Sequence, residues 1–132
     1  MGADPWTYYV PFEPSVADAL EKLRRRVFAD GEYRGAEWNP ATPEAALEES
    51  GDEGTASILD ILSVSDSIAI CAVCPLPERR LIELLGTSRP THEMVVANRG
   101  YFADLDRGQA VYVTIYKDGK PHEYLFAGYS VD

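Results

Sequence analysis

Hydrophobic and polar residues follow patterns along this chain that predict a mixture of strands and helices. Residues 6–12 are aromatic and β-branched, which favours a first strand that Pro11 ends or places at a sheet edge. A long helix is expected between Ser15, which has the chemistry of an N-cap, and Gly31, which stops it. Its buried stripe consists of the apolar residues at helical spacing, Val16, Leu20, Leu23 and Val27.

Shorter elements are predicted in the middle of the chain. Thr42 and Pro43 have the pattern of a helix start, and this helix should end near Gly51. The apolar runs 57–62 and 67–73 follow, and the second predicts a buried strand. Two further helices are expected, one over 77–86 and one over 91–105.

The clearest local pattern is a C-terminal hairpin. Residues 110–117 and 120–129 flank Asp118 and Gly119, a dipeptide that is typical of a two-residue hairpin turn. Such a turn predicts the cross-strand pairs Tyr116 with Pro121, Thr114 with Glu123, Val113 with Tyr124, and Val111 with Phe126. The core face is then expected to contain Val111, Val113, Ile115, His122, Tyr124 and Phe126.

These elements predict the α+β class: an antiparallel or mixed sheet that ends in a C-terminal β-hairpin, with three to four helices packed mainly on one face. The chain has 132 residues and 45% hydrophobic residues. A chain of this length is sufficient for one hydrophobic core, so we expect one globular domain over residues 1–132.

Net charge changes the functional picture. Twelve basic and 22 acidic residues give −10, which makes nucleic acid a poor partner and a basic protein a better one. Residues 27–66 contain ten acids and only one base, Arg34, so this segment carries −9 and the rest of the chain −1. An acidic surface that only maintains solubility is the alternative explanation.

The expected compartment is the cytoplasm. The first residues lack the basic and apolar regions of a secretory signal, and no apolar run is long enough to cross a bilayer, so no membrane partner is expected. Two cysteines exclude a disulfide scaffold and are consistent with a reducing environment.

Signals for catalysis, metals and cofactors are weak. Cys71 and Cys74 form a C-x-x-C pair, for which redox chemistry and structural burial are alternatives, and zinc binding with His92 and His122 would need convergence of distant segments. Asp60 lies in an apolar run, where it is either a functional carboxylate or one that caps a turn or pairs with an arginine. No phosphate-binding loop, dinucleotide fingerprint or serine-nucleophile elbow occurs. We therefore assign no catalytic residue, no metal and no cofactor.

The candidate binding surface lies within the acidic segment. Tyrosine, tryptophan and arginine dominate binding hot spots, and all three occur in the loop 33–39. The predicted binding residues are Tyr33, Arg34, Glu37, Trp38, Glu48, Glu49, Asp52 and Glu53. In the alternative, Tyr33 and Trp38 fold inward as a lid over the core.

Our leading hypothesis is a small acidic binding module of the immunity, inhibitor or regulatory type that engages a basic protein partner. The alternative is a small enzyme or ligand-binding protein with a pocket between the helices and the aromatic sheet. Its lining would include Tyr112, Tyr116, Asp60 or His122. A third possibility is a homo-oligomer that associates through an exposed edge of the hairpin.

Overall fold

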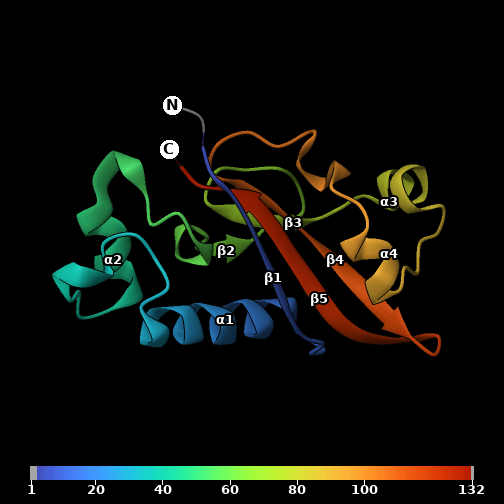
Figure 1. Cartoon of the computed structure of the whole chain (residues 1–132), viewed down its shortest axis with the longest axis horizontal. Helices are drawn as coiled ribbons and strands as arrows, with labels where there is room; N and C mark the ends of the chain where they lie inside the picture. The colour runs from blue at the N-terminus through green and yellow to red at the C-terminus, as the bar shows by residue number, and fades with distance from the viewer. Residues whose placement is uncertain (1–2, 132) are drawn as a thin grey trace.

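The structure, a computed structural model that describes residues 3–131, contains one five-stranded sheet. The strands lie in the order β1-β5-β4-β3-β2 (Figure 1). β5 is antiparallel to β1 and β4, whereas β2 and β3 run parallel to β4. In chain order the strands are β1 (Pro5–Pro11), β2 (Ser63–Val64), β3 (Ala72–Pro75), β4 (Gln109–Lys117) and β5 (Lys120–Tyr129). The α+β class and a mixed sheet with a C-terminal hairpin are confirmed.

Helices cover both faces of the sheet, rather than mainly one as expected. The connection from β1 to β2 contains α1 (Val16–Asp30) and α2 (Pro43–Ser50), which pack on one core. The connection from β3 to β4 contains α3 (Glu78–Leu85) and α4 (His92–Val96), which pack on a second core. Neighbouring residues of β5 alternate between these cores, because successive side chains of a strand point to opposite faces.

The first strand and the first helix form where the sequence predicts them. β1 is an edge strand with a proline at each end, and α1 begins after Ser15, whose hydroxyl accepts a hydrogen bond from the Asp18 N–H. Gly31 ends α1 with a φ of 68°, a conformation that glycine adopts without a steric penalty. The predicted stripe packs on the core: Leu20, Leu23 and Val27 are buried, and Val16 is half-buried.

The hairpin turn is confirmed, but its predicted register is wrong beyond the first pairs. Asp118 and Gly119 have φ values of 53° and 77°, as a type I′ turn requires, and Tyr116 pairs with Pro121. The register then shifts by one residue, so that Ile115 pairs with Glu123, and His122 is the extra residue of a β-bulge. The observed pairs are Thr114 with Tyr124, Val113 with Leu125, Tyr112 with Phe126, and Val111 with Ala127.

Because of this bulge, the predicted core face is wrong as well. Val111, Val113 and Ile115 belong to the core beneath α3 and α4, whereas Tyr124 and Phe126 belong to the opposite core. The bulged His122 is exposed and is not an interior residue.

Two other segments differ from their predicted structure. The expected helix over 91–105 stops at Val96, because the Asn98 side chain accepts a hydrogen bond from the Gly100 N–H and donates one to the Leu84 carbonyl. A short 3₁₀ turn, Gly100–Phe102, follows. The strand expected over 67–73 begins only at Ala72, after Cys71 with a φ of 59°.

Candidate functional site

The acidic segment folds into a lobe at one end of the molecule. We define the acidic lobe as residues 30–53, which contain the 3₁₀ turn Ala36–Trp38, helix α2 and the turn Gly51–Glu53. Figure 1 shows α2 and its flanking turns at the left, at the opposite end of the molecule from α3. Eight of the ten acids of residues 27–66 lie in this lobe, and all eight are exposed: Asp30, Glu32, Glu37, Glu44, Glu48, Glu49, Asp52 and Glu53.

These eight carboxylates are not neutralised by neighbouring bases. Within residues 3–131 none of them forms an ion pair. Carboxylates elsewhere in the protein do, as in the pairs Glu13 with Lys22 and Asp104 with Arg80, in which N and O are 2.6 and 2.9 Å apart. The lobe therefore carries a net negative charge, with eight carboxylates against the single base Arg34, and in the described chain its carboxylates are free of ion pairs.

The two aromatic residues of the lobe have different surroundings. Tyr33 is half-buried and stacks on Phe28, with ring centroids 5.8 Å apart and planes inclined by 15°. Burial raises the pKa of the Tyr33 phenol, and the charges of Glu49 and Glu37 raise it further. Trp38 is 55% exposed. Of the two aromatic residues that the lid alternative expected to fold inward, only Tyr33 packs inward, and Trp38 remains exposed at the surface.

Gly35 fixes the position of the Trp38 ring. A Cβ atom at Gly35 would lie 3.0 Å from two atoms of the indole, closer than side chains normally approach. The φ of Gly35 is 94°, a conformation that disfavours any residue with a side chain. The indole therefore rests on the bare backbone of the loop.

Arg34, the single base of the segment, is used within the protein. Its Nη1 donates to the Glu53 carbonyl at 2.8 Å, and its Nη2 lies 3.4 Å from Oδ2 of Asp4. Its backbone N–H donates to the Thr55 carbonyl at 2.8 Å. These bonds fasten the loop to the neighbouring segment, so Arg34 positions the lobe.

A buried polar network lies next to the lobe. Asp60 is fully buried, and its Oδ1 accepts hydrogen bonds from the Thr55 backbone N–H at 2.6 Å and from the Thr55 hydroxyl at 2.8 Å. Because the Thr55 hydroxyl donates to Asp60, the Ser57 hydroxyl must donate to Thr55, and it accepts from the Leu59 N–H. Within the described chain Asp60 has no ion pair. It closes the turn that follows the lobe, which is the structural alternative that the sequence left open.

Gly54 allows the close approach that this turn needs. A Cβ atom there would lie 3.0 and 3.1 Å from the two carboxylate oxygens of Asp60, and the φ of Gly54 is 71°. The turn is therefore specified by backbone conformation as well as by hydrogen bonds.

The two cysteines lie in or next to β3, whereas both histidines line one pocket beside the hairpin turn. Cys71 is half-buried, Cys74 is buried, and both thiols are free. Burial raises the pKa of each thiol, and the Asp60 charge adds to the effect at Cys71, whereas a reactive cysteine needs a lowered pKa. His92 Nδ1 lies 2.5 Å from Oε1 of Glu123, and His122 is exposed at the bulge. Residues 3–131 contain no group of three or more histidine, cysteine or acidic side chains placed to hold a metal ion.

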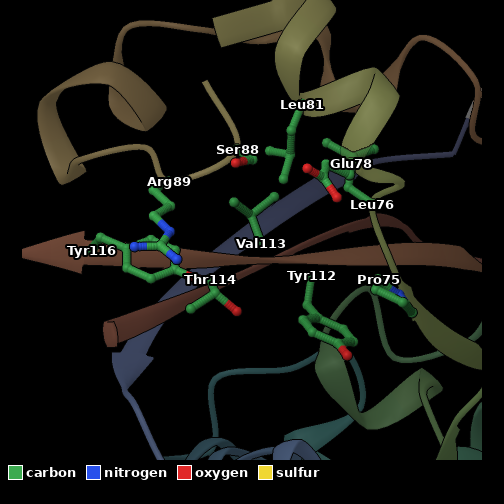
Figure 2. A pocket seen from close by; sticks show the side chains of 10 residues that line it. All are labelled: Pro75, Leu76, Glu78, Leu81, Ser88, Arg89, Tyr112, Val113, Thr114 and Tyr116. Atoms are coloured by element: carbon green, nitrogen blue, oxygen red, sulfur yellow. The ribbon is translucent and has the colours of Figure 1, made fainter. Parts of the chain in front are cut away.

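A pocket lies at the carboxyl end of β3, and the sequence did not reveal most of its lining. It has a volume of about 330 Å³ and is bounded by the end of β3, the first turn of α3, the connector 86–91 and the second half of β4 (Figure 2). Tyr112 and Tyr116 line it, as the ligand-binding alternative expected, whereas Asp60 and His122 do not. Its polar side chains also include Glu78, Ser88, Arg89 and Thr114.

We found no match to the chain among protein-family models, curated proteins or solved structures. None of the helices in residues 3–131 combines the length and the apolar character that crossing a bilayer would require.

Proposed function

We propose that the protein is a binding module of the inhibitor, immunity or regulatory type, and that its acidic lobe engages a basic protein partner. The observation that carries this proposal is the set of eight exposed carboxylates, without ion pairs among the described residues, in the same lobe that exposes Trp38. No catalytic role is needed for this function.

Charge and shape supply different parts of the interaction. Like charges on one surface accelerate encounter with a surface of opposite charge and lower the affinity for other acidic surfaces. Affinity then depends on an anchor that becomes buried in the complex, and tryptophan is the residue type most enriched at such positions. The exposed indole of Trp38 can also attract a lysine or arginine side chain, because a cation is attracted to the negative face of an aromatic ring.

The lobe is preorganised for this role. Arg34 ties the loop to Glu53 and to Thr55, and Tyr33 packs on Phe28, so the loop that presents Trp38 has internal support. A binding surface that is already ordered loses less conformational entropy when a partner binds.

Binding of an oligolysine peptide tests the charge argument directly. A lobe variant with Glu48→Gln, Glu49→Gln, Asp52→Asn and Glu53→Gln is compared with a control variant with Glu21→Gln, Glu83→Gln, Glu93→Gln and Asp106→Asn. Each carries four neutralisations, so both have a net charge of −6 instead of −10. Isothermal titration at low salt and at about 0.15 M salt measures the affinity.

We expect the lobe variant to bind about tenfold more weakly, and the control variant to lose no more than about twofold. Trp38→Ala is expected to weaken binding about threefold, through the lost cation–π contact. Equal losses in the lobe and control variants would show that only net charge matters and would refute the lobe as the site.

A further inference from the structure

The edge of β4 is open where it lines the pocket. The Leu76 N–H donates to the Tyr112 carbonyl at 3.0 Å, and the Tyr116 N–H donates to the Pro90 carbonyl at 2.8 Å. The backbone groups of Tyr112 and Tyr116 therefore point away from β5, and those of Thr114, halfway between them, point the same way. Within residues 3–131 neither the N–H nor the carbonyl of Thr114 has a backbone partner on that side.

The sequence creates this gap. β3 pairs with β4 only as far as Pro75, and Pro77 then leads the chain into α3. Pro77 is the N-cap residue of α3, so the chain leaves the sheet there and β3 does not continue along Thr114. On the far side of the gap, Pro90 presents its carbonyl to Tyr116 and closes the edge again. The position beside β4 is thus vacant between the end of β3 and Pro90, and no strand of the described chain occupies it.

The two ends of the pocket carry opposite charges. The Arg89 guanidinium lies over the Tyr116 ring, 5.8 Å from its centroid, and Glu78 lies at the other end in the first turn of α3 (Figure 2). In the described part of the chain neither side chain forms an ion pair. Between them the wall is formed by Leu81, Val113 and Ser88 (Figure 2).

We infer that this pocket binds a short extended peptide of two or three residues whose amino and carboxyl ends are both free. The peptide adds a strand beside β4, donating an N–H to the Thr114 carbonyl and accepting a hydrogen bond from the Thr114 N–H. Its carboxylate meets Arg89 and its ammonium group meets Glu78. This binding site is separate from the acidic lobe.

Charge and backbone direction agree on the orientation of the peptide. β4 runs from the Glu78 end of the pocket toward the Arg89 end, because Tyr112 contacts Leu76 just before α3 and Tyr116 contacts Pro90 just after Arg89. A peptide parallel to β4 therefore places its amino end at Glu78 and its carboxyl end at Arg89. This is also the direction of β3, whose line the peptide continues.

The dimensions limit the length of the peptide. The two closed positions, Tyr112 and Tyr116, are four residue steps apart on β4, which corresponds to about 13 Å at the usual rise of a strand. A tripeptide extends over about 10 Å and leaves room for a charge contact at each end. The volume of about 330 Å³ is at the small end of the range for ligand pockets, which excludes a long chain folded within it.

Trialanine in three forms tests this inference: with free ends, with an acetylated amino end, and with an amidated carboxyl end. Titration into ¹⁵N-labelled protein gives both the affinity and the location of binding. We expect free trialanine to shift the Thr114 amide resonance, and each blocked form to bind about tenfold more weakly because one charge-assisted contact is lost.

Two variants assign each end of the peptide. In Glu78→Gln, the free and acetylated peptides should bind equally, because the ammonium contact is already lost. In Arg89→Gln, the free and amidated peptides should bind equally. Both positions are exposed, so folding should be unaffected, and amide spectra check this.

Three outcomes would overturn the inference: no shift of the Thr114 amide at millimolar trialanine, equal binding of all three peptides by the unmodified protein, or unchanged discrimination in the two variants. The lobe variant with four substitutions should bind trialanine with the same affinity as the unmodified protein. Failure of the peptide site is therefore distinguishable from failure of the acidic lobe.

Discussion

The acidic lobe and the rest of the molecule use their carboxylates differently. Outside the lobe, Glu21 and Glu83 each contact two arginines, and Asp104 contacts Arg80. Inside the lobe, eight exposed carboxylates contact no base within residues 3–131.

The charges of the lobe therefore do not hold it together. Its structure rests on Tyr33 against Phe28, on the bonds of Arg34, and on the buried network of Asp60. Unpaired like charges repel one another and lower the stability of a compact state. The buried supports can therefore be altered separately from the exposed charges.

The largest effect is expected from removing the buried support. Asp60→Ala leaves the N–H and the hydroxyl of Thr55 without their shared acceptor, and we expect a loss of about 3 kcal/mol in the free energy of unfolding. Urea denaturation followed by circular dichroism measures the change. Asp66→Ala is the matched control: this carboxylate is exposed, and we expect a change of about 0.5 kcal/mol or less. Similar losses in both variants would contradict the structural role of Asp60.

A smaller effect is expected in the loop that supports Trp38. Gly35→Ala adds a methyl group against the indole at a φ of 94°, and we expect a loss of about 2 kcal/mol together with a change in Trp38 fluorescence. Gly86→Ala provides the control, since Gly86 has a φ of 76° but no atom within 4 Å of an added Cβ. It should lose about 1 kcal/mol from backbone strain alone, with unchanged emission. Equal losses would show that the ring does not rest on Gly35.

The smallest effect concerns the titration of Tyr33. Its pKa is raised, so the folded state holds the phenolic proton more tightly than the unfolded state does. The free energy of unfolding therefore falls as pH rises above about 10, the ordinary tyrosine value, and is unaffected by this group below it.

Charge removal separates the causes of that shift. Glu37→Gln with Glu49→Gln should lower the Tyr33 pKa part of the way toward its ordinary value, because burial remains. Glu93→Gln, in α4, is the control and should leave it unchanged. NMR titration of ¹³C-labelled tyrosine measures both. If the Tyr33 pKa is the same in the double variant as in the unmodified protein, the carboxylates of the lobe do not act on this ring.

The sequence predicted the elements whose patterns are local. Ser15 and Gly31 bound α1 correctly, and Asp118 with Gly119 marks the turn. The bulge at His122 could not be predicted, because a one-residue slip is visible only when one strand face is polar. β4 and β5 are buried on both faces, so Tyr124, Leu125 and Phe126 are all buried in succession and their pattern fits either register.

The two candidate sites also differ in how far the sequence predicts them. The acidic lobe was predictable as a segment because its acids are close in the sequence, although only the structure separates exposed Trp38 from half-buried Tyr33. The pocket was predictable only through its tyrosines. Glu78 and Arg89 come to its two ends because the connection from β3 to β4 returns over the sheet, and no spacing in the sequence indicates that meeting.

The prolines of β1 have a consequence for the behaviour of the protein in concentrated solution. The Phe12 N–H donates to the His122 carbonyl of β5, and the Asp4 carbonyl accepts from the Ser130 N–H just after β5. The backbone groups at positions 5, 7, 9 and 11 therefore face outward along the edge of the sheet. Two of these four positions, Pro5 and Pro11, have no hydrogen to offer. The opposite border, β2, is only two residues long. Neither border is a good template for strands of other molecules, which protects the protein against fibril growth.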